Sequence, residues 1–344
     1  MQLNYAPYGL LLQHAFKLAH GSRSKTDTVA VSLAHEGLVG FGEAALPPYL
    51  GETSESVMRF LSRVDTFQIQ LHDPEHTRNY IDSLSPTDNA AKAAIGIAYV
   101  DLLAKTRNVP SRSLFGITSD LTPTSAFTIG ISELEELPAK LHQAAGFGII
   151  KLKLGGSNDL ELFNAVRQMT DKPLMIDANQ GWKDAETALR MIDHFTGKNV
   201  LLVEQPLSIQ TDPNDWYWLK ERSPVPIFAD ESVKRLSDLS LAHDLFHGIN
   251  IKLMKCTGVF EAFDMIGHCR KNGLKVMIGC MTESSCAIMA AAQLAPLADF
   301  ADLDGPWLIT NNYYETPELR SGKLLLPDAS GHGSLPIPGL HPLL

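Results

Sequence analysis

The chain has 344 residues, of which 44% are hydrophobic and 20% charged, and its formal net charge at pH 7 is −10. This length exceeds one ordinary domain and supplies enough apolar side chains for a large core. The acidic balance and the scattered lysines and arginines argue against a surface that binds nucleic acid. No apolar run is long enough to span a bilayer, and the first residues lack the basic and apolar parts of a secretory signal.

Four cysteines occur in one segment, without the CxxC spacing of a metal site or the spacing of a disulfide framework. Such cysteines are typical of reduced thiols in a cytoplasmic enzyme. We therefore expect a cytoplasmic protein with no membrane or nucleic-acid partner, either monomeric or homo-oligomeric. The four are Cys256, Cys269, Cys280 and Cys286.

Residues 1–120 predict an α+β domain. Apolar and β-branched runs predict strands at 10–12, 28–33 and 38–43, and a short turn at Glu36 and Gly37 joins the last two. Strands followed by helices are typical of a separate α+β unit. The helices are expected near 53–65, 74–83 and 87–107.

From residue 121 the pattern changes to a repeat of about 25 residues. A strand at 125–131 is followed by seven short apolar runs, with segments of helix length between them. This alternation predicts a (β/α) barrel over 121–310. Residues 311–344 are rich in Pro and Gly, and we expect them to return to the first domain. The seven runs are 149–153, 173–177, 201–204, 226–230, 249–252, 276–280 and 300–304, and the helices are expected near 132–146, 158–170, 183–196, 212–222, 235–246, 258–272 and 283–295.

Three successive runs end in the carboxylates Asp177, Glu204 and Asp230. Consecutive strand ends are neighbours on one rim of a barrel, so these side chains should converge. Each acid alone could cap a helix or pair with a base, but three carboxylates in one pocket repel unless a cation lies among them. All-oxygen ligation favours a hard divalent ion, and we predict Mg²⁺.

Lysines lie on either side of these acids. Lys151 and Lys153 are two residues apart on one strand and so share a face, whereas Lys252 ends a strand about halfway around the barrel. One such lysine alone could simply extend from the rim into water. Lysines on opposing walls could instead flank a substrate. We expect burial or a nearby metal to lower their pKa values, so that either can act as a base.

This set of motifs resembles the enolase superfamily, in its muconate-lactonizing-enzyme subgroup. The resemblance rests on Lys151, Lys153, the three acids and Lys252, and it extends over almost the whole chain. It implies a modified (β/α)7β barrel of the TIM type, with an N-terminal α+β capping domain and a C-terminal return. It also implies that Mg²⁺ binds a substrate carboxylate, that Lys151 contacts this carboxylate, and that Lys153 and Lys252 form an acid/base pair.

The last run adds a second acidic pair, Asp302 and Asp304. With a period of two, both carboxylates should share one face of the strand, although the pair could also serve as a helix cap. The pair resembles the signature of dipeptide epimerases, in which it binds the α-ammonium group of the substrate. Together with a lysine on each face, the resemblance implies 1,1-proton transfer at the α-carbon of the dipeptide's C-terminal residue.

Further substrate contacts are implied by the same resemblance. They come from Thr128 on the first barrel strand and from a segment on the seventh. Arg23, expected in a loop over residues 20–25, would suit a glutamate side-chain carboxylate, with Lys25 as the alternative. This favours L-Ala-D/L-Glu, a dipeptide released from peptidoglycan, whereas a neutral residue would favour apolar dipeptides. The segment on the seventh strand is Cys280, Met281 and Thr282.

Two polar residues are expected to act behind those that touch the substrate. Asn179 should support the metal or Lys153, and Glu231 should orient Lys252 or its neighbours. Neither is expected to take part directly in proton transfer.

Other functions share parts of this pattern. A muconate cycloisomerase or an o-succinylbenzoate synthase would share the acids and lysines, but its substrate carries no ammonium group for Asp302 and Asp304. An acidic-sugar dehydratase would need a histidine on the seventh strand. A Schiff-base aldolase barrel would need one lysine and no metal. A barrel that only binds a ligand would have no use for lysines on opposing walls.

Overall fold

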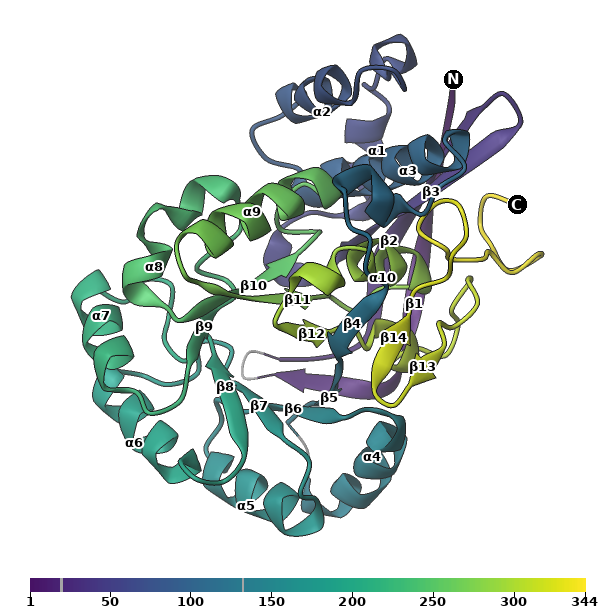
Figure 1. Cartoon of the computed structure of the whole chain (residues 1–344). Coiled ribbons are helices and arrows are strands. Elements are labelled where there is room, and N and C mark those ends of the chain that lie inside the picture. Colours follow the sequence, from purple (N-terminus) through teal and green to yellow (C-terminus); the bar gives the residue numbers. More distant parts are fainter. Residues whose placement is uncertain (19–20, 132) are drawn as a thin grey trace.

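The computed structural model describes residues 1–18, 21–131 and 133–344 (Figure 1). Its N-terminal part is an antiparallel sheet in the order β1 (Gln2–Leu18), β2 (Gly21–His35) and β3 (Leu38–Leu46). The first two strands are far longer than the apolar runs predicted, because β1 and β2 pair along nearly their whole length. Backbone pairing supports the polar stretches that carry no hydrophobic signal of their own.

The length of this hairpin corrects one prediction. Arg23 was expected in a loop over residues 20–25, but it lies in β2, opposite Phe16 of β1. His20 of the expected loop lies outside the described residues. The far part of β1 is also tied to the segment after the barrel, since Leu12 forms an antiparallel bridge with Ile309.

Three helices follow this sheet, as predicted; α1 and α3 pack against it, and α2 packs on α3. The third, α3, lies against β2 and β3 and is buried over almost its whole length. It can approach closely because β3 carries glycine there: a Cβ at Gly42 would lie 2.0 Å from the carbonyl oxygen of Ala94. The helices are α1 (Ser54–Leu61), α2 (Pro74–Ser83) and α3 (Asn89–Thr106), with short 3-10 helices η1 (Pro48–Leu50), η2 (Thr66–Gln68) and η3 (Ser111–Phe115).

Within the described residues, the central part of the chain forms an eight-stranded parallel sheet whose strands follow one another in chain order. A parallel bridge between Ser125 and Ala301 joins its two edges, which closes the barrel. The predicted barrel fold is therefore confirmed. The strands are β5 (Ala126–Ile129), β6 (Ile149–Lys153), β7 (Leu174–Asp177), β8 (Val200–Glu204), β9 (Ile227–Ala229), β10 (Gly248–Lys252), β11 (Lys275–Gly279) and β12 (Phe300–Asp302).

Helices surround this barrel on its outer side (Figure 1). The segment expected as one helix over 235–246 is instead a 3-10 helix, η6 (Leu236–Leu241), followed by a single turn, α8 (Ala242–Leu245), because its Ser and Asp side chains compete with helical hydrogen bonding. The other barrel helices are α4 (Leu137–Gln143), α5 (Asp159–Met169), α6 (Ala185–Phe195), α7 (Pro213–Arg222), α9 (Val259–Lys271) and α10 (Ser285–Ala292), with short 3-10 helices η4 (Leu134–Glu136), η5 (Ala144–Gly146), η7 (Ala295–Leu297) and η8 (Gly305–Trp307).

Side chains that point into the barrel form layers. The lowest layer is apolar and consists of Ala126, Ile149, Met175, Leu202, Phe228 and Met277. Because side chains alternate along a strand, the residue two positions further on points inward one layer higher. Those positions include Thr128, Lys151, Asp177, Glu204 and Asp230. The alternation in the sequence thus places a ring of ionisable groups directly above an apolar floor.

The segment after β12 returns to the N-terminal sheet. Tyr313 donates a hydrogen bond from its hydroxyl to the buried carboxylate of Glu43 on β3. A ring nitrogen of His332 lies 3.0 Å from the carbonyl oxygen of Phe41 on the same strand. A small antiparallel sheet of β13 (Leu319–Arg320), β14 (Lys323–Leu325) and β4 (Leu121–Thr124) anchors this segment to the barrel. We keep the division into 1–120, 121–310 and 311–344 as a proposal.

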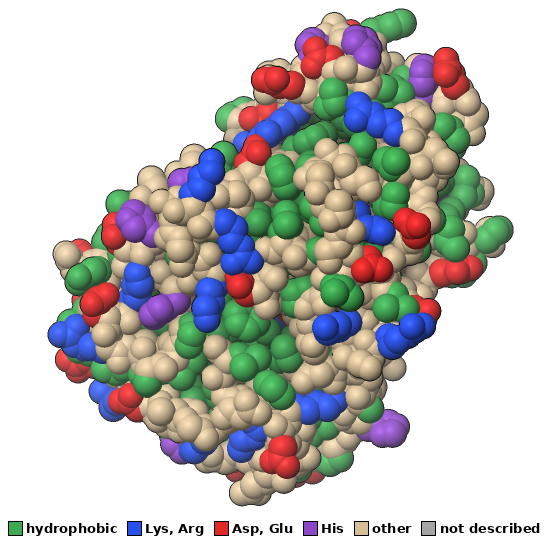
Figure 2. Space-filling model, viewed as in Figure 1, with side chains coloured by type: hydrophobic (Ala, Val, Ile, Leu, Met, Phe, Trp, Pro, Cys, Tyr) green, Lys and Arg blue, Asp and Glu red, His purple; other side chains and the backbone are tan. Residues whose placement is uncertain are grey.

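Among the described helices, none combines the length and apolar character that a membrane crossing requires. On the face shown in Figure 2, basic and acidic side chains are interspersed and do not gather by sign.

Candidate functional site

A cavity opens at the C-terminal ends of the barrel strands, above the apolar floor. Most of the predicted site residues line it, together with two that the sequence did not indicate, Tyr49 of η1 and Leu308 after η8. Asp177 and Glu204 lie behind its wall in contact with Lys151. The lining residues are Arg23, Tyr49, Thr128, Lys151, Lys153, Asn179, Asp230, Lys252, Cys280, Met281, Thr282, Asp302, Asp304 and Leu308.

The three predicted metal ligands converge. Asp177 and Glu204 end neighbouring strands and Asp230 directly follows the next one; all three are buried and offer oxygens that lie within 4.8 Å of one another. Burial and the charge of Asp177 raise the pKa of Glu204 to about 7. Burial also acts to raise the pKa values of the two aspartates, but lysines outweigh it. Lys153 and Lys151 hold the pKa of Asp177 at about 2, and Lys252 and Lys255 hold that of Asp230 well below its usual range.

This cluster fits a hard divalent cation. Three buried carboxylates repel one another, and the charge of Asp177 adds to burial in raising the pKa of Glu204. A cation among them would remove the conflict, and the all-oxygen donor set is the kind that Mg²⁺ prefers. The residues present therefore suit the ion expected from the sequence.

The lysines face the carboxylates from two sides. Lys153 lies on β6, with its Nζ atom 2.5 Å from Asp177 Oδ2, and Lys252 lies on β10, with its Nζ atom 2.6 Å from Asp230 Oδ2. These strands are four positions apart in the eight-stranded ring, so they form opposite walls. Lys151 also lies on β6, and its Nζ atom is within 3.1 Å of Asp177, Glu204 and Asp302.

The electrostatics bear on one expectation. Burial or a nearby metal was expected to lower the pKa values of these lysines, and burial does act in that direction on Lys252. The negative charge of Asp230 outweighs it, so the pKa of Lys252 is raised well above its ordinary value. Asp302, Glu204 and Asp177 outweigh burial in the same way at Lys151.

A fourth buried lysine, Lys255, was not predicted. It lies in the loop after β10, and its Nζ atom donates to Asp230 Oδ1 at 2.5 Å and to the carbonyl oxygen of Asp230 at 2.6 Å. The carbonyl oxygens of Val233 and Asn250 complete its contacts. Lys252 and Lys255 thus each hold one oxygen of the same carboxylate. Only the loop's fold turns Lys255 inward, so its spacing from Lys252 gave no signal.

A second unpredicted residue lies beneath the carboxylates. The side chain of Asn250, buried on β10, donates from Nδ2 to Glu204 Oε1 at 2.8 Å. Its side chain also crosses to the next strand, where a Cβ at Gly279 would lie 2.3 Å from Asn250 Oδ1. The sequence could have predicted this position. Asn250 is two residues before Lys252 on the same strand, so its side chain points into the barrel as that of Lys252 does.

The second acidic pair lies beside Lys151, but Asp304 is not in the strand. β12 ends at Asp302, and Asp304 precedes η8, so the two carboxylates do not share a strand face as predicted. Both nevertheless line the cavity. Asp304 Oδ2 accepts from the backbone N–H of Thr128 at 2.6 Å. Burial and Asp302 raise the pKa of Asp304 to about 7. Among the described residues, Asp302 Oδ1 is buried without a hydrogen-bond partner.

The wall after β11 faces the N-terminal sheet. Arg23 donates from Nη2 to Thr282 Oγ1 at 3.0 Å, and burial lowers the pKa of its guanidinium group. Tyr49 places its hydroxyl 2.6 Å from Met281 Sδ. Lys25, the alternative to Arg23, is half exposed and pairs with Asp27. Arg23 is therefore the basic residue that the hairpin brings to the cavity.

The two supporting residues lie next to each other. Asn179 donates from Nδ2 to Glu231 Oε1 at 3.4 Å, and its backbone N–H donates to Asp177 Oδ1 at 2.9 Å. Burial and the charge of Asp230 raise the pKa of Glu231. The contacts place Asn179 beside a carboxylate of the triad. Glu231 accepts a hydrogen bond from Asn179, and the positive charge of Lys252 acts against the rise in its pKa.

Comparison with known proteins identifies two family models that match this chain. The model of the enolase C-terminal domain-like family matches residues 133–336, and that of the mandelate racemase / muconate lactonizing enzyme N-terminal domain matches residues 9–116. An L-Ala-D/L-Glu epimerase of Bacteroides thetaiotaomicron is 46% identical, over 98% of this chain and 88% of its own. An L-Ala-D/L-amino acid epimerase of Pedosphaera parvula is 36% identical, over 96% of this chain and 97% of its own.

The fold is similar to that of a solved epimerase. The crystal structure of a dipeptide epimerase from Enterococcus faecalis, complexed with Mg and L-Leu-L-Tyr, matches with a TM-score of 0.89 and 29% identity, and the match covers 97% of this chain and 99% of that chain.

Replacing Lys255 by Met should destabilise the fold by about 3 kcal/mol or more, because Asp230 would remain buried with one oxygen unpaired. Urea denaturation measures the loss. The control is Lys183→Met, since the side chain of Lys183 is 82% exposed and pairs with the partly exposed Asp184; it should leave the midpoint unchanged. Equal stability of the two variants would show that Lys255 does not hold Asp230.

Proposed function

The chain belongs to the enolase superfamily, in the group of mandelate racemase and muconate lactonizing enzyme, and we propose that it is a Mg²⁺-dependent dipeptide epimerase. The reaction is a 1,1-proton transfer at the α-carbon of the C-terminal residue. One observation carries the proposal: Lys153 and Lys252 come from opposite walls of the barrel, and the strands that bear the carboxylate triad lie between them. Relatives that are epimerases over nearly the full length support it.

Asp177, Glu204 and Asp230 are the residues that would hold Mg²⁺. When bound there, the ion offsets the negative charge that grows on the substrate carboxylate as the α-proton leaves, as in enolase-superfamily enzymes generally. The Mg-bound dipeptide epimerase of similar fold supports this assignment.

Lys153 and Lys252 would exchange protons with opposite faces of the α-carbon. The uncharged amine of one lysine takes the α-proton, and the ammonium group on the other wall returns a proton to the opposite face. The configuration inverts, and the two lysines exchange protonation states. Both side chains are buried, which keeps bulk water from competing as a proton donor.

The remaining charged residues would orient the two ends of the dipeptide. Lys151 lies at the centre of the ring, where it can contact the substrate carboxylate. Asp302 and Asp304 would receive the α-ammonium group, and the unpartnered Oδ1 atom of Asp302 offers a free acceptor for it. The separation of these groups fixes which residue of the dipeptide presents its α-proton to the lysines.

We further propose L-Ala-D-Glu and L-Ala-L-Glu as substrates, dipeptides that turnover of peptidoglycan would supply in the cytoplasm. Arg23 supports an acidic second residue, because its buried guanidinium group reaches the cavity and could bind a carboxylate through two hydrogen bonds. The uncharged wall of Cys280, Met281 and Thr282 would lie against the dipeptide backbone.

Incubation of L-Ala-L-Glu with protein and Mg²⁺ in deuterated water should exchange the α-hydrogen of the glutamate and produce the D-epimer. Lys153→Ala and Lys252→Ala should each abolish inversion, because one face then has no acid or base, while each keeps exchange of the epimer that the other lysine serves. Proton NMR follows exchange, and chiral chromatography follows inversion. Absence of exchange with every dipeptide tried would refute the epimerase proposal.

Arg23→Ala should lower kcat/KM for L-Ala-L-Glu roughly 10- to 100-fold, the cost of a charge-assisted hydrogen bond. The value for L-Ala-L-Leu should hardly change. Lys25→Ala serves as the matched control and should leave both substrates unaffected, since Lys25 pairs with Asp27 at the surface. An equal loss for the two dipeptides in Arg23→Ala would mean that Arg23 does not select the acidic side chain and would favour the apolar-dipeptide alternative.

A further inference from the structure

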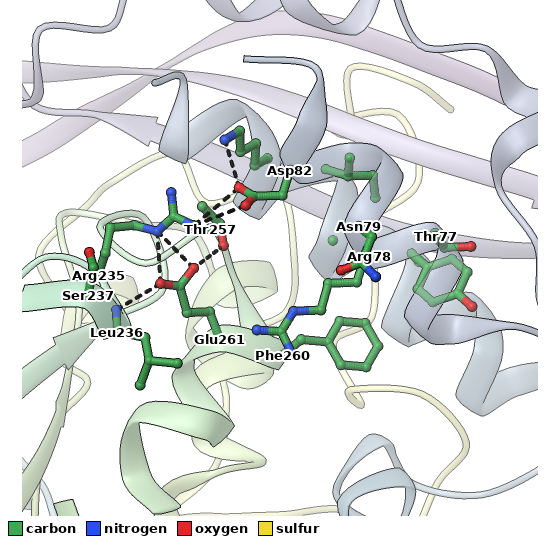
Figure 3. A pocket seen from close by; sticks show the side chains of 14 residues that line it. Thr77, Arg78, Asn79, Asp82, Arg235, Leu236, Ser237, Thr257, Phe260 and Glu261 are labelled. Atoms are coloured by element: carbon green, nitrogen blue, oxygen red, sulfur yellow. Dashed lines mark hydrogen bonds and ion pairs between the residues drawn. The ribbon is translucent and has the colours of Figure 1, made fainter. Parts of the chain in front are cut away.

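A cavity of about 390 Å³ lies between helices α2 and α3 of the N-terminal part and the barrel elements η6 and α9 (Figure 3). Charged groups from both sides project into it and bind one another. Asp82 of α2 accepts from Lys92 of α3 at 2.8 Å and from Arg235 at 3.2 Å. Arg235 in turn donates from Nε to both oxygens of Glu261 at 2.8 Å. Because these charges satisfy each other, the cluster acts as a clamp between two parts of the chain. We call Asp82, Lys92, Arg235, Thr257 and Glu261 the interdomain clamp.

Glu261 is the centre of this clamp. Besides Arg235, its carboxylate accepts from the backbone N–H of Leu236 at 2.8 Å and from the hydroxyl of Thr257 at 2.7 Å (Figure 3). The first contact belongs to the loop after β9, which begins with Asp230. The second belongs to the loop that follows Lys252, the last residue of β10. One buried carboxylate therefore joins the segment that carries a proposed metal ligand to the loop that follows a proposed acid/base residue.

The loop after β10 is strained at the point where Glu261 holds it. Thr257 has a φ of 61°, a left-handed conformation that a β-branched residue rarely adopts. Gly258 follows with a φ of 103°, and a Cβ there would lie 3.2 Å from the Cα atom of Ala93 in α3. Such strain persists only where the surroundings impose it, and it is concentrated at functional sites. The hydroxyl contact with Glu261 and the packing on α3 are what impose it here.

The strained turn reaches Lys252 through short contacts. The backbone N–H of Lys255 donates to the carbonyl oxygen of Lys252 at 2.9 Å, and that of Gly258 donates to Leu253 at 3.0 Å. Asn89 at the start of α3 donates to the carbonyl oxygen of Lys255 at 2.8 Å. The backbone that follows Lys252, Lys255 included, is therefore held by the turn, and the turn is held by Thr257 and Glu261.

We propose that Glu261, acting through Thr257, is a positioning residue for Lys252 and so controls one half of the epimerisation. The inference rests on the proposed function. Of the two acid/base lysines, Lys252 is the one followed by a loop that the clamp contacts within the described residues. Its loss should therefore impair proton transfer at one face of the α-carbon and spare the other.

The test compares α-hydrogen exchange of the two epimers of L-Ala-Glu, each measured separately as an initial rate in deuterated water with Mg²⁺. The variant Lys252→Ala first identifies the epimer whose α-proton faces Lys252, because that epimer alone loses exchange. In Glu261→Gln, exchange of that epimer should fall roughly 10- to 100-fold, as expected when a reacting group is displaced by about an ångström. Exchange of the other epimer should change less than about twofold.

Two milder substitutions keep the test decisive if Glu261→Gln folds poorly. Thr257→Ser retains the hydroxyl that binds Glu261 and should keep both exchange rates. Thr257→Gly removes the hydroxyl while accepting the positive φ without strain, and it should lose exchange on the Lys252 side only. The matched control is Asp299→Asn. Asp299 also binds one arginine, Arg270, and one backbone N–H, that of Val276, but it precedes β12 at the opposite end of the barrel.

An equal fall for both epimers in Glu261→Gln would indicate general loosening and overturn the proposal. Unchanged exchange rates in Glu261→Gln would also overturn it. The same holds if Asp299→Asn loses exchange of one epimer only, or if Thr257→Gly exchanges both epimers as fast as Thr257→Ser. If the wild-type protein exchanges neither epimer while remaining folded, the proposed function fails and this inference fails with it. If the wild-type protein exchanges both epimers and the variants slow both exchange rates equally, the inference fails but the proposed function stands.

Discussion

The site depends on the opposition of buried lysines and carboxylates one layer above the apolar floor of the barrel. In the described part of this ring, four lysines face five carboxylates, those of the triad and of Asp302 and Asp304. Full ionisation leaves one negative charge. With a divalent cation among them the balance is one positive charge, and the loss of a proton from one lysine removes it. The ammonium and α-carboxylate groups of the proposed dipeptide cancel, and Arg23 would match the side-chain carboxylate of its glutamate. With the cation bound, this count is compatible with one lysine as a free base and the other as an acid.

The fold stabilises these buried charges. Buried ionised groups are costly unless each has a partner, and here every lysine of the ring lies within hydrogen-bond distance of a carboxylate. The apolar floor keeps water out from below, and the long hairpin of β1 and β2 approaches from above through Arg23. Glycines of β3 let helix α3 pack closely against the N-terminal sheet. The same helix also packs against the loop after Lys252.

The parts of the site that the sequence predicted are those fixed by strand periodicity. Asp177, Glu204 and Lys252 end regular strands and Asp230 directly follows one, so the alternation of side chains and the β/α repeat together determined that they converge. The parts that could not be predicted depend on tertiary contacts. Arg23 lies in a strand because β1 and β2 pair far beyond their apolar runs. Lys255 turns inward because a strained loop reverses its direction, and Asp304 leaves the strand because β12 is only three residues long.

The direct test of the account is whether the triad binds one divalent cation. Calorimetric titration of Mg²⁺ should show one site per chain in the wild-type protein and none in Asp177→Asn. The pKa of Glu204 is raised to about 7 in the cation-free protein, and a ligating carboxylate must lose its proton. The affinity should therefore increase as the pH rises through 7 and level off above it. A wild-type protein that binds no Mg²⁺, or that binds it as well after Asp177→Asn, would contradict the account.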